Sequence, residues 1–295
     1  MGFLSDTDKW FSRFRSREKG TDKLLDAGID FSDLDESEIN EDLGGRLVRN
    51  GGDGEVRIFG KYSSAEIEEL MAWSGIFEEL EAKGYTKHEL DLQYLSELDQ
   101  RIFVKENDQV LIHIRLKLSH FRFRLHPGAP RKKLLYIDWL MTAHPRARHF
   151  RPERLFPGQE LPGLGIFSQL SDFIANLAIG LGARGAFNIP EYFHDALLFH
   201  RQFNFYDPVR EAFFRALMRD LRKHGARKIS RAFAEGRVFD RNDHVVQWTP
   251  GEMISILSPE LEEQVWSREY YTRVVREMKR NQYRLGDEAP SSSSS

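Results

Sequence analysis

The chain has 295 residues, no cysteine and a formal net charge of −3. A chain of this length can bury a full hydrophobic core, either as one large domain with additions or as two domains. The lack of cysteine excludes disulfides, thiolate metal sites and a cysteine nucleophile, and it fits the reducing cytoplasm. The small acidic net charge argues against nucleic acid as a partner, because nucleic-acid binding normally needs a basic face.

The ends of the chain predict no transmembrane or secretory segment. No apolar run approaches the roughly 18 residues that span a membrane, and the N-terminus lacks the apolar segment of a signal peptide. Residues 1–54 combine a basic, aromatic segment with a Gly-containing acidic stretch, which predicts an N-terminal arm and a linker. Residues 287–295 end in five serines and predict a disordered tail. We therefore expect a cytoplasmic protein that does not span a membrane.

A short strand and a helix open the predicted core. Residues 55–62, EVRIFGKY, are a strand candidate. Ser63 is followed three residues later by Glu66, which is the capping-box pattern, so a helix is predicted to begin after Ser63. Apolar residues at helical spacing continue this helix through Leu80, and Gly84 ends it.

An antiparallel meander is predicted over residues 100–141. Glu106-Asn107-Asp108 forms the turn between its first two strands. At Ser119-His120 the alternation of apolar and polar residues changes phase, which predicts a bulge or a corner. A further strand follows over residues 133–141. The basic side chains of the meander form either a solvated sheet face or a site for an anionic substrate or carrier.

A strand, a glycine turn and a helix follow one another in the centre of the chain. After the strand at 133–141, the turn contains Gly163-Leu164-Gly165, and apolar spacing predicts an amphipathic helix over residues 166–181. A short strand at 187–189 and a helix at 192–203 come next. Such a strand-turn-helix arrangement brings backbone N–H groups and a helix N-terminus together, which suits a phosphate or pyrophosphate. A strand-helix-strand unit of this size normally forms a parallel pair with a right-handed crossover.

This order of elements resembles the acyl-CoA-binding core of the GNAT superfamily of N-acyltransferases over roughly residues 55–208. In that family a strand leads into a Gly-x-Gly loop whose amides hold the pyrophosphate of acetyl-CoA, and a helix follows. Gly163-Leu164-Gly165 matches the Gly-x-Gly, and Asn188 stands in the second strand, which often carries Asn. Ala196 opens the family's final pattern, and Asn204-Phe205 stands where Gly-Phe is usual.

The resemblance implies a mixed α/β fold. Its central sheet is mostly antiparallel with one parallel strand-helix-strand unit, and helices are added at both ends. The chain then divides into the arm and linker (1–54), an acyltransferase-like core (55–208), C-terminal helices and short strands (209–286) and the tail (287–295). The implied activity is N-acyl transfer from acetyl-CoA, another acyl-CoA or a pantetheine carrier to an unknown amine.

The residues that would contact the cofactor also follow from the resemblance. The strand before the glycine turn supplies a backbone amide donor, and the turn holds the pyrophosphate. The implied cofactor-binding residues are Leu140, Met141, Gly163, Leu164, Gly165, Ile166 and Asn188.

Four side chains are candidates for the chemistry. N-acyl transfer needs a base for the amine and an acid for the leaving thiolate. His200 stands where the family's common Tyr acid falls, and imidazole titrates near neutral pH; it is otherwise a histidine on a helix surface. Tyr192 is the alternative acid or a core aromatic residue. Asp138, within the apolar segment LYIDWLM, is a base candidate or a solvent-facing strand residue, and Glu191 is a second base candidate.

Two interpretations of function therefore stay open. The first is an active acyltransferase, and the second is a catalytically silent GNAT-like protein that acts as a binding or scaffold module. Glu160, where the family has Arg or Gln, and Pro162, which removes a backbone N–H, favour the second. The histidines lack the i, i+4 spacing of a metal motif, so no metal is expected.

The C-terminal region predicts further helices. Asp207-Pro208 has the pattern of a helix start, and Ser258-Pro259 begins a last helix that continues through Met278. Residues 236–248 and 253–257 are candidates for a terminal hairpin or edge strands. The last helix either packs on the core or offers a contact for a homodimer or a protein partner.

Overall fold

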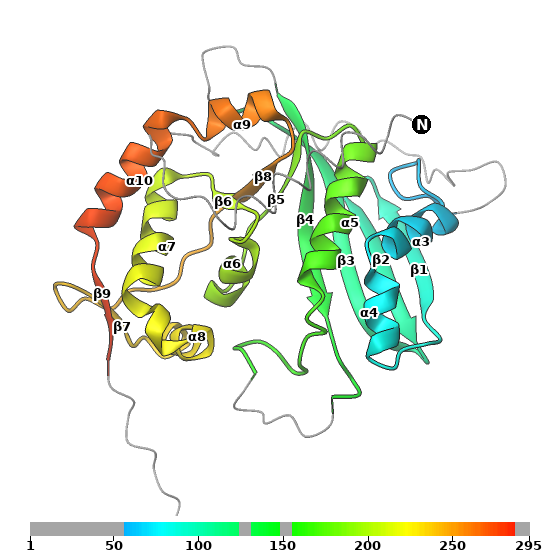
Figure 1. Ribbon diagram of the computed structural model, residues 1–295, viewed down its shortest axis with the longest axis horizontal. Coiled ribbons are helices and arrows are strands. Elements are labelled where there is room, and N and C mark those ends of the chain that lie inside the picture. The colour runs from blue at the N-terminus through cyan, green and yellow to red at the C-terminus, as the bar shows by residue number, and fades with distance from the viewer. Residues whose placement is uncertain (1–55, 124–130, 148–154, 287–295) are drawn as a thin grey trace, which may run out of the picture. The chain divides into compact units, whose positions relative to one another are not determined.

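The computed structural model describes residues 56–123, 131–147 and 155–286 (Figure 1). The predicted arm and acidic linker (1–54) and the predicted tail (287–295) lie outside these residues. The described residues divide into two compact units, which we call the helix–sheet unit (56–123, 131–146 and 163–186) and the C-terminal unit (147, 155–162 and 187–286). The described residues form a mixed α/β structure with eight α-helices and mostly antiparallel strands.

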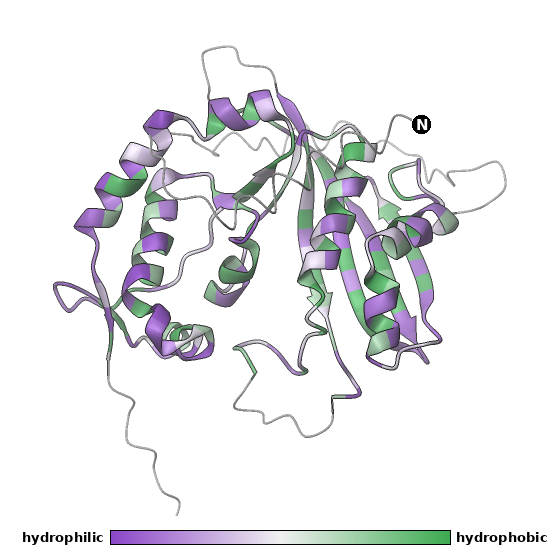
Figure 2. Ribbon diagram, in the orientation of Figure 1, coloured by the Kyte–Doolittle hydropathy of each residue, from purple (hydrophilic) through white to green (hydrophobic). Residues whose placement is uncertain are grey.

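The helix–sheet unit contains an antiparallel sheet of successive neighbouring strands, in which β1 pairs with β2, β2 with β3 and β3 with β4. These strands are β1 (Glu89–Ser96), β2 (Asp99–Glu106), β3 (Gln109–Phe121) and β4 (Lys132–Thr142). Along β2 and β3 hydrophobic and hydrophilic residues alternate (Figure 2), as expected for a sheet with one face packed on helices. The predicted meander is confirmed, and its strand expected at 133–141 spans 132–142, whereas β1 was missed because its residues are only partly buried.

The turn between β2 and β3 is where the sequence placed it. Asn107 and Asp108 have positive φ values of 48° and 63°. Asn and Asp tolerate this left-handed region better than most residues, which is why they are common in tight hairpins. The turn thus joins β2 to β3, whose pairing begins at Glu106 and Gln109.

The only register shift between β3 and β4 lies at Asp138. Arg115 pairs with Trp139 and Leu116 pairs with Ile137, so Asp138 is an extra residue on β4. The bulge expected at Ser119-His120 is wrong, because pairing there continues without a shift through Phe121. The phase change reflects burial near the strand end, where Phe121 is buried and His120 is exposed.

Two helices stand where one was predicted. Helix α3 (Ser64–Trp73) has the expected capping box between Ser63 and Glu66. It ends before Gly75, whose φ of +75° breaks the helical path, and α4 (Ile76–Ala82) begins directly after. The expected strand at 55–62 is wrong: Ile58 and Tyr62 form an isolated bridge around a tight turn.

Helix α5 (Phe167–Gly180) is buried on more than one side, since every residue from Phe173 to Ala178 is buried. Leu170, Phe173, Ile174 and Leu177 are at most 3% exposed, and each such side chain contributes about 1.5–3 kcal/mol by burial. The next strand, β5 (Gly185–Asn188), is buried along its length. The predicted helix at 166–181 is therefore confirmed, whereas the strand expected at 187–189 begins two residues earlier and ends one residue earlier.

The C-terminal unit consists mainly of helices with short strands. Strand β6 pairs with β8, and β7 pairs with β9. Its elements are α6 (Phe193–Phe199), β6 (Asn204–Phe205), α7 (Pro208–Leu221), the 3₁₀ helix η2 (Arg222–His224), α8 (Ala226–Ala234), β7 (Val238–Asp240), β8 (Met253–Ile256), α9 (Pro259–Val265), α10 (Arg268–Arg280) and β9 (Tyr283–Leu285).

Helix starts in this unit follow the predicted caps, but helix lengths do not. Asp207 caps α7 by accepting a hydrogen bond from the Val209 N–H at 2.8 Å. The last predicted helix is two helices, because the chain turns at Trp266 and Ser267 becomes the cap of α10. Within the described residues no helix is long and apolar enough to cross a membrane.

The capping box of α3 gives a first testable prediction. Ser63→Ala removes the side chain that accepts the Glu66 N–H and that lies 2.8 Å from the Glu66 carboxylate. We expect the free energy of unfolding to fall by about 1 kcal/mol. Urea denaturation measures this, with the neighbouring Ser64→Ala as control. An equal effect of both substitutions would show that the cap is not what stabilises this helix start.

Candidate functional site

The loop that leads into α5 exposes its glycines and buries its other two residues. Leu164 and Ile166 are 2% and 1% exposed, so their side chains anchor the loop in the core. Gly163, which precedes Leu164, and Gly165, which lies between Leu164 and Ile166, are exposed. This alternation turns bare backbone towards solvent at the start of the helix.

Thr142, at the end of β4, holds this loop in place. The Leu164 N–H donates a hydrogen bond to the Thr142 Oγ1 at 3.2 Å. A Cβ on Gly163 would lie 3.1 Å from the same oxygen, so glycine permits the close approach. Thr142 was not among the predicted site residues; its only signal in the sequence is a hydroxyl at the end of a strand.

Gly165 combines a left-handed backbone with open space. Its φ is +71°, which a residue with a side chain adopts only with strain. Among the described residues, no heavy atom beyond its chain neighbours lies within 4 Å of the position where a Cβ would stand. The backbone beside α5 is therefore accessible to a ligand.

The first turn of α5 is open to an anion. Its N-cap, Ile166, makes no side-chain capping hydrogen bond, and the first turn contains no acidic residue. The first N–H groups of a helix have no partner within the helix, and the helix dipole makes this end positive. Phosphate groups bind at such places. The arrangement can thus hold a phosphate or pyrophosphate.

The predicted cofactor residues fall into the two units. Leu140 and Met141 are half-buried on β4, directly before Thr142, and pair with Ile114 and His113 of β3. The structure thus brings the end of β4 and the glycine loop together within the helix–sheet unit. Asn188 belongs to the C-terminal unit, where it is 4% exposed and its Oδ1 has no hydrogen-bond partner within 56–123, 131–147 and 155–286.

Asp138 is held in an ion pair. It occupies the bulge of β4, and its carboxylate contacts the Arg115 guanidinium. Two further cations of the sheet are also paired: Arg101 with Asp99, and Lys105 with Asp91 at 2.5 Å. Three cations of the sheet are therefore paired with neighbouring carboxylates.

His200 contacts a fully buried carboxylate. It is the C-cap of α6, and its Nε2 lies 2.9 Å from the Oε1 of Glu211, a residue with no exposed surface. Glu211 also accepts hydrogen bonds from the Arg215 Nε at 2.6 Å and from the Phe205 N–H at 3.0 Å. The sequence did not identify Glu211 as the partner of His200. An acidic residue in the first turn of a helix is ordinarily explained by its favourable interaction with the helix dipole.

The pKa of Glu211 reflects these contacts. Burial alone would raise it, but the charges and hydrogen bonds of His200 and Arg215 outweigh burial and lower the pKa from 4.5 to about 2. Glu211 is thus an ionised buried group, and His200 and Arg215 supply its compensation.

Tyr192 and Glu191 lie at the exposed start of α6. The charge of Glu191, followed by burial, raises the pKa of Tyr192. His194 stacks between Phe156 and Tyr192, with ring centroids 4.5 and 5.4 Å away, and burial lowers its pKa to about 4.

Asp195, which is half-buried, is a second acid whose pKa is shifted. It accepts a hydrogen bond from the Tyr192 N–H at 3.3 Å, while burial raises its pKa to about 6. The sequence signal for Asp195 was its place three residues after the helix cap.

Neither a metal-binding cluster in the described part of the chain nor a similar known protein points to the function of this site. Among the residues that the structure describes, no group of three or more His, Asp or Glu side chains is placed to hold a metal ion. Comparison of the chain with protein-family models, with curated proteins and with solved structures found no match.

The buried Glu211 carboxylate gives a second prediction. Glu211→Gln leaves His200 and Arg215 without their anion, so we expect the free energy of unfolding at neutral pH to fall by about 3 kcal/mol. Because the folded pKa lies below 4.5, the advantage of Glu over Gln is full above pH 4.5 and is lost as the pH falls towards about 2.

Denaturant unfolding across this pH range measures the effect, with exposed Glu263→Gln as the matched control. A difference between Glu211 and Gln that does not change with pH would contradict the assignment of an ionised carboxylate.

Proposed function

We propose that this protein is an N-acyltransferase-like protein whose donor is acetyl-CoA, another acyl-CoA or a related pantetheine thioester. The observation that carries the proposal is the open start of α5, with no capping side chain and no first-turn carboxylate after an exposed glycine loop. The pyrophosphate of coenzyme A is the kind of anion that such a helix start stabilises. The sequence resemblance supplies the acyl-transfer chemistry.

The reaction requires three contributions from the chain. A base, Asp138 or Glu191, takes a proton from the acceptor amine as its nitrogen bonds to the acyl carbon. Backbone amides near Leu140 and Met141 stabilise the oxyanion that forms on the acyl oxygen. The carbon–sulfur bond then breaks, and an acid, His200 or Tyr192, protonates the leaving thiolate.

A second function, a catalytically silent binding or scaffold module, also has support. Asp138 is paired with Arg115, and His200 is hydrogen-bonded to Glu211. Both contacts are what a purely structural role requires. Pro162 further lowers the number of N–H groups in the loop before α5.

The donor site can be tested by placing a carboxylate in it. Ser168 is exposed in the first turn of α5, so Ser168→Asp puts a negative charge where the pyrophosphate would bind. We expect the melting temperature to be maintained or raised, because the charge favours the helix dipole. We also expect calorimetry to show acetyl-CoA affinity reduced about tenfold or more, whereas Ser168→Asn stays near wild type.

Failure of the wild-type chain to bind acetyl-CoA or longer acyl-CoAs would sink the donor assignment. If binding occurs, release of coenzyme A with a panel of amines separates the two functions. Loss of turnover in Asp138→Asn at unchanged acetyl-CoA affinity supports an active enzyme. Binding without turnover with any amine supports the silent module.

A further inference from the structure

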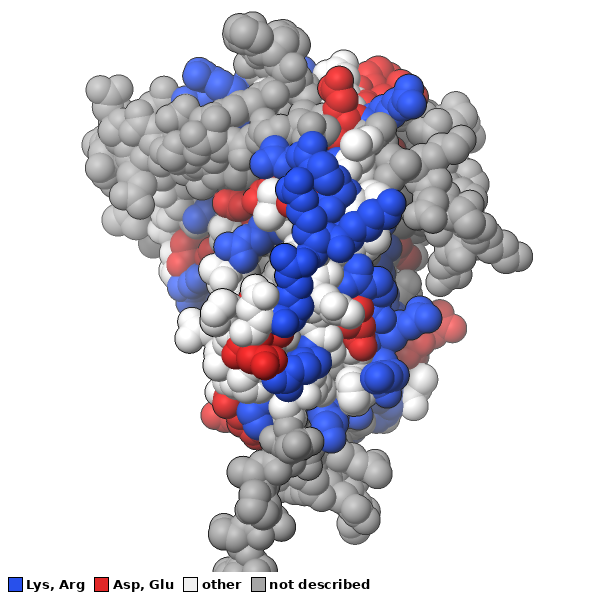
Figure 3. Space-filling model, turned by 90° about the vertical axis from the view of Figure 1, so that its left-hand side faces the viewer, with Lys and Arg blue, Asp and Glu red and all other residues white. Residues whose placement is uncertain are grey.

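A polar groove in the C-terminal unit is independent of the proposed acyl-CoA site. It lies where α7 and α10 end, beside the turn after β7, and has a volume of about 240 Å³. Four cationic side chains, one carboxylate and the amide side chains of Asn281 and Gln282 line it. Lys and Arg side chains gather on the face of the molecule that carries these elements (Figure 3).

The one carboxylate of the groove is already neutralised. Asp220 accepts hydrogen bonds from the Arg219 Nε at 2.7 Å and Nη2 at 2.8 Å, and from the Tyr283 N–H at 2.9 Å. Burial opposes ionisation of Asp220, but these contacts outweigh it and lower its pKa. Asp220 therefore does not cancel the other cations of the groove.

Arg219 also satisfies the negative end of α10. Its Nη1 donates to the Met278 carbonyl at 2.9 Å, and its Nη2 donates to the Asn281 carbonyl at 2.6 Å. Basic residues at a helix C-terminus often serve this purpose. Because Arg219 already binds carbonyl groups at the end of α10, Lys279 and Arg280 are not needed as caps.

The other three cations of the groove carry more positive charge than the carboxylates beside them neutralise. Arg280 shares the Glu277 carboxylate with Arg276, at 3.0 and 3.1 Å. Lys279 and Arg241 are exposed and have neither an ion pair nor a hydrogen bond from their side chains within the described chain. The groove thus presents unneutralised cations, although the whole chain has a net charge of −3.

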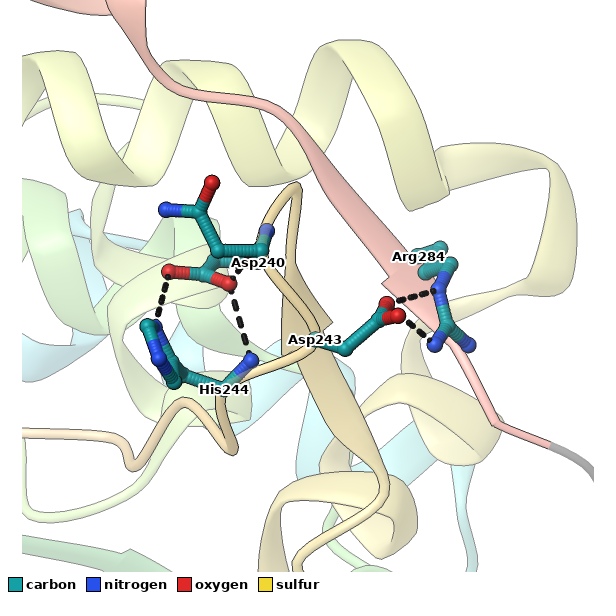
Figure 4. A network of polar contacts seen from close by, with 5 residues as sticks. Asp240, Asp243, His244 and Arg284 are labelled. Carbon is teal, nitrogen blue, oxygen red and sulfur yellow. Dashed lines mark hydrogen bonds and ion pairs between the residues drawn. The ribbon is translucent and has the colours of Figure 1, made fainter.

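Arg241 comes from a separate segment whose conformation is fixed. The preceding Asp240 accepts hydrogen bonds from the Asn242 N–H at 2.8 Å and the His244 N–H at 2.9 Å, and its carboxylate also contacts the His244 ring (Figure 4). Arg284 of β9 binds Asp243 at 2.6 Å in the same network. A helix dipole does not account for Arg241, because Arg241 follows a strand.

We propose that this groove binds a phosphate-bearing ligand through Arg241, Lys279 and Arg280, with Asn281 and Gln282 as amide donors. Arg and Lys are the side chains that bind phosphate oxygens most strongly. None of the described residues that line the groove is apolar or aromatic, so they offer nothing for an acyl chain or a stacked base. Its volume is below the roughly 300 Å³ at which pockets for drug-sized ligands begin, which suits a phosphate or diphosphate group.

Titration with inorganic pyrophosphate tests the site. The experiment uses the full chain carrying Ser168→Asp, so that the start of α5 does not contribute. Arg241→Gln with Lys279→Gln removes the two unpaired cations, and we expect at least about tenfold weaker binding. The matched control is Arg201→Gln with Lys223→Gln, two exposed cations outside the groove, and it should bind like its parent.

A second arm identifies the source of the phosphate. Sedimentation with phosphatidylcholine vesicles, with and without phosphatidic acid, asks whether a lipid headgroup occupies the groove. Groove-dependent binding of pyrophosphate alone indicates a soluble phosphate compound, and groove-dependent sedimentation with phosphatidic acid indicates a lipid. Binding of neither probe, or equal loss in the control variant, overturns the proposal. Neither result depends on whether acetyl-CoA binds at α5.

Discussion

The uncapped N–H groups at the start of α5 are the physical feature on which the proposed chemistry depends. A helix start without a capping side chain leaves positive partial charge that water or an anion must satisfy. Burial of Leu164 and Ile166 and the hydrogen bond to Thr142 fix the loop that precedes it. The stability of this loop therefore comes from the core, while its exposed glycine backbone stays accessible.

Charges in the C-terminal unit follow a different rule. Glu211 is fully buried, and its ionisation is compensated by His200, Arg215 and a backbone N–H. In the groove beside α10, by contrast, Lys279 and Arg241 are left without such compensation among the described residues. Compensated charges hold the fold together, whereas uncompensated ones on a surface are available to a ligand.

Local chemistry in the sequence predicted where elements begin and turn. The capping box at Ser63, the cap at Asp207 and the Asn107-Asp108 turn each depend on a few neighbouring residues, so their residues sufficed. The break at Gly75 was missed because apolar spacing continues across it. Propensity and periodicity say nothing about a single left-handed residue inside a pattern that is otherwise helical.

The arrangement of the candidate site was predictable only for residues that are neighbours in the sequence. The strand-turn-helix pattern placed Gly163, Leu164, Gly165 and Ile166 where a loop meets the start of a helix, which is where the structure has them. The partners of the candidate side chains were not found, because Arg115 lies 23 residues before Asp138 and Glu211 lies 11 residues after His200. Such contacts depend on strand register and helix packing, which one sequence does not specify. They decide what each ionisable group can do.

The most direct measurement is the change in backbone amide chemical shifts when the isotope-labelled chain is titrated with coenzyme A. If pyrophosphate binds at the start of α5, the largest changes fall on the amides from Leu164 to Gln169. Saturable binding whose largest changes fall elsewhere, or no change at any amide, would contradict the assignment of this helix start as the donor site.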